Sequence, residues 1–317
     1  MTGYWDDARV LVTGGAGFLG SHVVQALQAA GCREVIVARS RDYDLTREEA
    51  TIRLLRDTLP DFVFHLAGLV GGILANKERP AEFFYQNLTM GTFLLHHACR
   101  LGVRKFIAAG AGCGYPEHAP LPLRESVFWD GLPQAESAPY SLAKRLLHIQ
   151  ALAYQRQYGF VTVIAIPGNI YGPYDNFDLE SAHVIPALIR KFFEATDEGR
   201  SKIVVWGSGR PTRDFVYAGE VARGMLLAAE RYDAVELVNL SSGVETSIRE
   251  VVHHLVELTG FKGRVVWDPD RPDGQARRGF DVSKARRDLG FEASIPIREG
   301  LALTLRWFSE QRALART

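Results

Sequence analysis

The chain has 317 residues, of which 47% are hydrophobic and 23% charged, an ordinary balance for a globular protein of one large or two modest domains. Lys plus Arg and Asp plus Glu both number 37, so no net charge attracts nucleic acid or an anionic membrane. No secretory signal or membrane-spanning run is visible, and the three cysteines form no CxxC pair. We therefore expect a cytoplasmic protein with no nucleic-acid or membrane partner and no disulfide framework.

The first half alternates short apolar strands with amphipathic helices. This rhythm predicts an α/β fold with a doubly wound parallel sheet, because apolar strands of this kind are covered on both faces. The expected strands are 9–13, 34–38, 62–66, 105–109 and 161–166. The expected helices are 18–30, 47–59, 80–101 and 139–158.

The rhythm changes after Pro167, where Gly and Pro cluster. The expected helices of this half are 183–196, 221–230, 247–258 and 297–312, and the expected strands are 203–206, 237–240 and 264–267, with a charged loop from there to 278. We interpret residues 1–170 as a dinucleotide-binding domain and 171–317 as mainly a smaller α/β substrate-binding domain. Elements near 213–245 are expected to return to the first domain.

A glycine-rich turn lies between the first strand and the first helix, with Gly14, Gly17 and Gly20 in G-x-x-G-x-x-G spacing. Glycines allow a tight turn and a close approach of the backbone to a pyrophosphate. The helix that begins with Phe18 and Leu19 offers free N–H groups to the phosphates. A plain βα turn is the alternative, but the order of strand, glycines and helix favours a dinucleotide site.

The end of the second strand bears on the choice of cofactor. NAD-binding sheets carry an acidic residue there, whereas an arginine suits the 2′-phosphate of NADP. This chain has Arg39 and Arg41 and no carboxylate before Asp42. We favour NADP over NAD, although two solvated surface arginines would look the same. Asp44 and Leu45 follow in a loop that is placed to contact the adenine.

Tyr140 and Lys144 are four residues apart in a helix that begins near Ser137 and Pro139, so they share one face. An ammonium beside a phenol stabilises the phenolate and lowers a pKa that is otherwise about 10. Such a tyrosine exchanges a proton with a carbonyl or alcohol next to a nicotinamide. The pair is common by chance, but together with the glycine turn it predicts a nicotinamide-dependent oxidoreductase.

With these motifs the chain resembles the extended short-chain dehydrogenase/reductases, and within them the GDP-L-fucose synthases, which act on GDP-4-keto-6-deoxymannose as 3,5-epimerase/4-reductases. The resemblance covers nearly the whole chain. The matching stretches are HLAGLVGG (65–72), YQN (85–87), CGYP (113–116), NIYGP (169–173), DNFDLESAHVIPALIR (175–190), VVWGSG (204–209) and PDG (272–274). The 175–190 stretch is specific to that family.

The resemblance implies a set of site residues and partners. The epimerising acid and base would be Cys113 and His183, both types that titrate near neutral pH. Further cofactor contacts would come from Leu66, Ala67, Gly68, Pro167, Asn169, Ile170 and His183. Contacts to a GDP-linked nucleotide-sugar would come from Asn169, Lys191, Trp206, Arg213 and Arg278. The alternative is that these are only a packed aromatic residue and solvated polar residues. No metal is expected. A homodimer packed through helices 80–101 and 139–158 is implied.

One departure from the family pattern concerns the catalytic serine. The family reads Gly-Ser-Ser-Cys before Tyr-Pro, whereas this chain has Gly110, Ala111, Gly112 and Cys113, with Ala111 in the place of the serine. Loss of one donor to a developing oxyanion costs about 10²–10³ in rate. Three outcomes follow: another group substitutes, the reaction is a redox-neutral epimerisation or uses another sugar, or the protein is a non-catalytic NADP sensor or scaffold.

Overall fold

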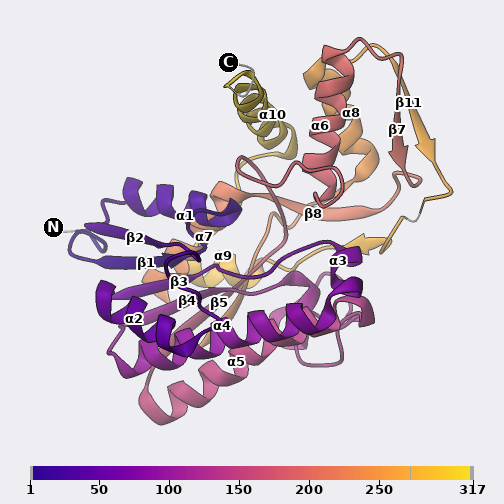
Figure 1. Cartoon of the computed structure of the whole chain (residues 1–317). Helices are drawn as coiled ribbons and strands as arrows, with labels where there is room; N and C mark the ends of the chain where they lie inside the picture. The colour runs from indigo at the N-terminus through magenta and orange to yellow at the C-terminus, as the bar shows by residue number, and fades with distance from the viewer. Residues whose placement is uncertain (1–2, 272, 315–317) are drawn as a thin grey trace.

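The centre of the molecule is a six-stranded parallel sheet. The structure is a computed structural model that describes residues 3–271 and 273–314 (Figure 1). The strands are β1 (Arg9–Thr13), β2 (Glu34–Ala38), β3 (Phe62–His65), β4 (Lys105–Ala109), β5 (Val161–Pro167) and β9 (Glu236–Leu240). Their order is β2-β1-β3-β4-β5-β9, and every neighbouring pair is parallel. The predicted doubly wound α/β fold is confirmed.

Helices cover both faces of this sheet (Figure 1). One face carries α1 (Phe18–Ala29) and α7 (Ala218–Arg231), and their core includes Val23 and Val221. The other carries α2 (Glu48–Thr58), α4 (Pro80–Arg100) and α5 (Ala138–Tyr158), with Leu94 and Leu147 in the core. The short α3 (Ile73–Glu78) precedes α4, and α9 (Ser283–Leu289) packs against α7 and β9.

A smaller part of the molecule is built around β8 (Thr212–Tyr217). This strand pairs with β6 (Asn169–Tyr171) and β12 (Arg277–Arg278) in parallel and with β10 (Glu245–Ser247) in antiparallel. A parallel pair, β7 (Lys202–Trp206) and β11 (Arg264–Asp268), extends beyond it. Three helices, α6 (Val184–Asp197), α8 (Ile248–Thr259) and α10 (Ile297–Leu314), bury a third core around Phe192 and Leu255.

The structure differs from the prediction mainly after Pro167. The segments that form β6, β8, β10, α9 and α3 were not predicted as elements, and the loop expected up to residue 278 contains β12. Pro272 of the PDG stretch lies outside the described residues. The strand predicted at 237–240 does join the large sheet, as β9, beside β5. None of the described helices is long and apolar enough to cross a membrane.

Candidate active site

The glycine turn after β1 packs tightly on the end of β3. A Cβ on Gly14 would lie 2.7 Å from the amide nitrogen of Ala67, and one on Gly20 would lie 2.0 Å from the carbonyl oxygen of Gly14. Gly14 also has a φ of +71°, a conformation that favours glycine. Gly17 precedes α1, which begins with Phe18, and no described side chain caps the helix. The first N–H groups of α1 are therefore available to an anion.

The loop after β2 carries the residues expected at an adenosine phosphate. Arg39 and Arg41 are both exposed, and the nearest carboxylate of Arg41 is Asp42 at 3.5 Å. The Asp44 carboxylate accepts hydrogen bonds from the backbone N–H and the hydroxyl of Thr46, at 3.0 and 2.6 Å, and these bonds lower its pKa. Leu45 is buried. The arginines are thus free to meet a phosphate, whereas Asp44 is bound within its own turn.

The segment after β3 lies against the catalytic helix. Leu66 and Ala67 lead into Gly68, where a Cβ would lie 2.8 Å from the amide oxygen of Asn87 and 3.3 Å from Nζ of Lys144. Only a glycine lets these two side chains approach the backbone so closely. The segment predicted to contact the cofactor is therefore in contact with the lysine predicted to hold it.

Tyr140 and Lys144 lie in the first turns of α5, in a largely buried setting. Burial raises the pKa of Tyr140, and the nearby Cys113 thiol adds to this rise. Burial lowers the pKa of Lys144 to about 8, against a smaller opposing effect of Cys113. The expectation that the pKa of Tyr140 is lowered is wrong here, because desolvation of the phenolate is the largest effect and raises it. Tyr140 is a neutral O–H donor at physiological pH.

The turn that carries Cys113 contains no hydroxyl, and a ring occupies part of the space. A Cβ on Gly112 would lie 2.8 Å from Cζ of Phe280, a buried side chain from the segment that follows β12. Nη2 of Arg278 donates a 3.3 Å hydrogen bond to the carbonyl oxygen of Gly112. Ala111 is also buried. No local sequence pattern predicts the contact with Phe280, because it joins segments that are distant in the chain.

Asp214 ties three segments together behind this turn. Its carboxylate accepts hydrogen bonds from the backbone N–H groups of Ser242, Gly243 and Phe280, at 3.0, 3.1 and 3.3 Å, and from the Ser242 hydroxyl at 2.6 Å. Burial raises its pKa. Asp214 follows Arg213 in β8, so this buried network fixes the strand that carries a predicted substrate contact. No motif in the sequence marks Asp214 as a site residue.

Other predicted site residues lie where β5 and β6 enter the smaller part. Pro167 is buried at the end of β5, and Asn169 and Ile170 begin β6 half-buried. His183 is the exposed residue before α6, and its imidazole has no hydrogen-bond partner among the described residues. The protein around the ring still lowers its pKa by desolvation.

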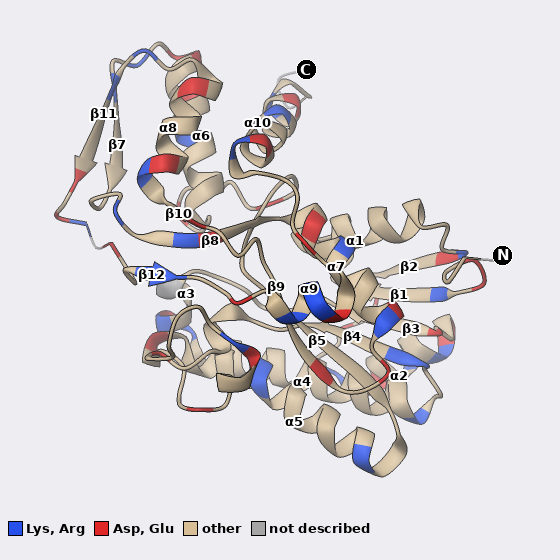
Figure 2. Cartoon of the chain, turned by 180° about the vertical axis from the view of Figure 1, so that it is seen from behind, with Lys and Arg blue, Asp and Glu red and all other residues tan. Residues whose placement is uncertain are grey.

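Trp206 is 59% exposed at the end of β7 and has two cations beside its ring. Nζ of Lys191 lies 5.2 Å and Cζ of Arg271 lies 4.9 Å from the ring centroid. Arg271 was not predicted as a site residue. Arg213 and Arg278 are direct partners in the pairing of β8 with β12, and Figure 2 shows basic residues on both strands. The predicted substrate residues thus form two basic groups in the smaller part.

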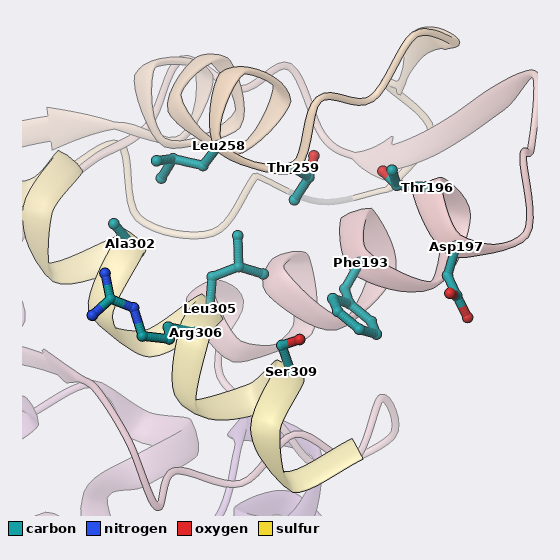
Figure 3. Close-up of a pocket in the computed structure, with 9 residues that line it drawn as sticks. All are labelled: Phe193, Thr196, Asp197, Leu258, Thr259, Ala302, Leu305, Arg306 and Ser309. Atoms are coloured by element: carbon teal, nitrogen blue, oxygen red, sulfur yellow. The ribbon is translucent and has the colours of Figure 1, made fainter. Parts of the chain in front are cut away.

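A hollow of about 390 Å³ lies elsewhere, between α6, α8 and α10 (Figure 3). Its lining includes Phe193, Leu258, Leu305 and Arg306. None of the predicted site residues lines it, so it is separate from the arrangement around Tyr140. The described residues also contain no group of three His, Cys, Asp or Glu placed to hold a metal.

A parallel sheet with a glycine turn at the first strand and a Tyr/Lys pair beside it defines a dinucleotide-dependent enzyme of the doubly wound class. The family model described as "NAD dependent epimerase/dehydratase family" matches residues 10–241, and the chain belongs to this family.

Similar proteins match this chain over most of their length. A GDP-L-fucose synthase of Sinorhizobium fredii is 39% identical over 94% of each chain. A probable GDP-L-fucose synthase 1 of Oryza sativa is 37% identical, over 95% of this chain and 92% of the relative. A crystal structure of a GDP-L-fucose synthetase from Naegleria fowleri bound to NADP is 30% identical, has a TM-score of 0.92, and is matched over 100% of this chain and 97% of that one.

Proposed function

We propose that the protein is an NADP-dependent nucleotide-sugar epimerase/reductase that acts on a GDP-4-keto-6-deoxy-hexose. The observation that carries this proposal is that Tyr140 and Lys144 share the first turns of α5, where Lys144 approaches Gly68 after β3 and the charge of Cys113 acts on both side chains. The GDP-L-fucose synthases to which the chain is similar support the substrate class.

The residues of the nucleotide site fit NADP. Gly14 and Gly20 have no side chain that would clash with the closely packed backbone of the turn. The start of α1 has no side-chain cap, so its N–H groups suit a pyrophosphate. Arg39 and Arg41 would hold the 2′-phosphate through charge-assisted hydrogen bonds. When bound, NADPH supplies the hydride for C4 of the sugar. The NADP-bound Naegleria fowleri structure supports this cofactor, and NAD is the alternative.

Epimerisation next to a ketone needs a base on one face of the carbon and an acid on the other. We assign these roles to Cys113 and His183, whose ring accepts and donates no hydrogen bond within the part of the chain that the structure describes. The desolvation that lowers the pKa of His183 keeps the ring neutral when it is not in use, so that it can accept a proton. Asn169, at the start of β6, would orient the sugar between them.

Reduction of the ketone needs a proton for O4. Tyr140 holds that proton, because burial raises its pKa and keeps the phenol neutral. Lys144 holds the nicotinamide ribose and offsets the charge that develops on the phenol oxygen. The diphosphate and the base would contact Arg213, Arg278, Lys191 and the exposed ring of Trp206.

The experiment combines purified protein, NADPH and GDP-4-keto-6-deoxymannose in deuterated buffer. We expect oxidation of NADPH, followed by its absorbance, and deuterium at C3 and C5 of the sugar, followed by NMR. The proposal is wrong if neither signal appears. Deuterium incorporation without NADPH oxidation would instead establish a redox-neutral epimerase, the alternative that the missing hydroxyl at Ala111 favours.

We also propose that the protein forms a homodimer through α4 and α5. Exposed apolar side chains gather on these two adjacent helices, as expected of a surface that another copy covers. They are Phe84, Tyr85, Leu146, Ile149 and Leu152. Light scattering should give twice the mass of one chain, and Ile149→Asp should give monomers.

The three cysteines are free, which supports a reducing compartment such as the cytoplasm.

A further inference from the structure

With Ala111 and Gly112 in place of the two family serines, the turn 110–113 has no hydroxyl to donate a hydrogen bond to the reacting oxygen. The place of the second family serine is closed, because Phe280 lies where a side chain on Gly112 would have to go. A donor for the oxyanion therefore has to reach this turn from another segment. The tyrosine hydroxyl alone would leave one lone pair of O4 without a partner.

Arg278 reaches the turn from β12. Its Nη2 donates to the carbonyl oxygen of Gly112 at 3.3 Å, one residue before Cys113. A guanidinium carries five N–H donors in a rigid plane, so further donors remain for other acceptors. The charge of Cys113 acts on Arg278, Tyr140 and Lys144, so Arg278, which contacts the residue before Cys113, shares an electrostatic environment with the phenol and the ammonium.

The surroundings of Arg278 point to an anionic ligand. Its guanidinium is in no ion pair with a carboxylate of the described residues, and its register partner in β8 is a second arginine, Arg213. Burial lowers the pKa of both guanidinium groups, and the charge of Arg278 lowers the pKa of Arg213 further. Two like charges directly opposite each other destabilise a strand pair. One diphosphate would neutralise part of this positive charge. The contact of Arg278 with the Gly112 carbonyl, however, directs the Arg278 guanidinium to the reacting end of the sugar.

We propose that Arg278 replaces the missing serine as the hydrogen-bond donor to the sugar oxygen that becomes an oxyanion. This inference rests on the proposed function. In the reduction, C4 receives hydride, the π electron pair of the carbonyl moves to O4, and O4 takes the proton of Tyr140. Arg278 keeps its protons and contributes a hydrogen bond that strengthens as charge develops on O4.

A double-mutant cycle between Arg278→Lys and Ala111→Ser tests this role. Lysine keeps the charge for the diphosphate but loses the planar fork of donors. We expect Arg278→Lys to lower the single-turnover rate of NADPH oxidation about 10²-fold, which is the cost of one oxyanion donor. In the Ala111→Ser background, where a hydroxyl is restored, the same substitution should cost less than about tenfold.

Arg213→Lys is the matched control, because Arg213 lies in register with Arg278 but does not contact Gly112. We expect it to raise KM by the same factor in both backgrounds and to leave the single-turnover rate nearly unchanged. The proposal is overturned if Arg278→Lys also acts mainly on KM, or if its effect on the rate is equal in the two backgrounds.

A second measurement does not depend on the substrate. The rate at which iodoacetamide alkylates Cys113 at neutral pH, followed by mass spectrometry of its peptide, reports how strongly nearby positive charge promotes the reactive thiolate. If the guanidinium lies at the reacting centre, Arg278→Gln should slow this alkylation, and Arg278→Lys should slow it less. An unchanged rate in Arg278→Gln would show that Arg278 does not face the site, whether or not the protein turns over the GDP-sugar.

Discussion

Phe280 and Gly112 are a matched pair: the Cζ atom of the ring is 2.8 Å from the point that a Cβ on the glycine would occupy. Any side chain at position 112 must displace a ring that is 3% exposed. The loss of one family serine therefore has a steric explanation that the sequence did not reveal. The loss of the other, at Ala111, is not explained by this contact.

The contact between Phe280 and Gly112 predicts that Gly112→Ser and Ala111→Ser change the free energy of unfolding by different amounts. We expect Gly112→Ser to lower the free energy of unfolding by about 1–3 kcal/mol, because it overpacks a buried contact. Ala111→Ser should have a smaller effect, and Phe280→Leu should recover part of the loss in Gly112→Ser by removing the atoms that clash. Denaturant titrations of the three single variants and the double variant measure this, and additive effects of Gly112→Ser and Phe280→Leu would contradict it.

Tyr140→Phe should stop proton transfer to O4 while leaving the fold intact. The neutral phenol is the donor, so its loss should lower the rate of NADPH oxidation by about 10²–10⁴-fold. The NADPH dissociation constant should stay within a factor of about three, since the glycine turn and the arginines after β2 are untouched. Stopped-flow absorbance and fluorescence titration provide the two readouts. A large loss of NADPH affinity would mean that Tyr140 chiefly binds the cofactor.

Lys144 imposes a pH-dependent cost on stability. Burial lowers its pKa from 10.5 to about 8, so between these values the unfolded chain binds more protons than the folded chain. Stability therefore rises with pH across this window, and the cost is fully present below it. We expect Lys144→Met to raise the free energy of unfolding by about 1–3 kcal/mol near neutral pH and to change it little above pH 10.5. Denaturant titrations without cofactor test this, and a neutral-pH loss of stability would contradict it.

Asp175, in the loop that leads to His183, has the opposite pH dependence. Burial raises its pKa from 3.8 to about 7, and one carboxylate oxygen, Oδ2, has no partner among the described residues. The folded chain binds the extra proton between these values, so stability falls as pH rises through them. Asp175→Asn keeps an acceptor for the Asn176 N–H and should add about 1–4 kcal/mol above pH 7, with little gain below pH 3.8. Thermal unfolding across pH provides the measurement.

Arg39 and Arg41 should distinguish NADP from NAD. Replacing both with serine removes the cations that would meet the 2′-phosphate, and we expect NADP to bind at least about tenfold more weakly. NAD binding should change less than threefold, since that dinucleotide carries a hydroxyl at the same position. Calorimetric titration of both dinucleotides measures the ratio. Equal losses for the two cofactors would place the arginines elsewhere on the nucleotide.

Much of the sheet could be predicted because buried parallel strands are short apolar runs. Three predicted strands, 9–13, 34–38 and 105–109, match β1, β2 and β4 residue for residue. The strands around β8 were missed because they are short or polar and depend on pairing between distant segments, as in Arg278 with Arg213. A strand of two residues has no periodicity of its own.

The features of the site also divide into those that a local sequence pattern predicts and those that it does not. The glycine turn and the Tyr140/Lys144 pair follow from spacing within one element, which sequence preserves. The contacts of Phe280 and Arg278 with Gly112 join segments far apart in the chain, and no local pattern encodes them. The pKa of Tyr140 was predicted in the wrong direction because the extent of burial depends on the packed structure, not on the neighbour four residues away.

The carboxylate of Asp214 bonds the loop after β9 of the large sheet and also the backbone of Phe280. This edge of β8 is thus pinned to the nucleotide-binding half. A rigid rotation that swings α6, α8 and the β7/β11 pair outward would have to use the pinned edge as its axis. Residues near this edge, such as Arg278, would then move little, and the hydrogen bond of Arg278 to the carbonyl oxygen of Gly112 would persist through the rotation.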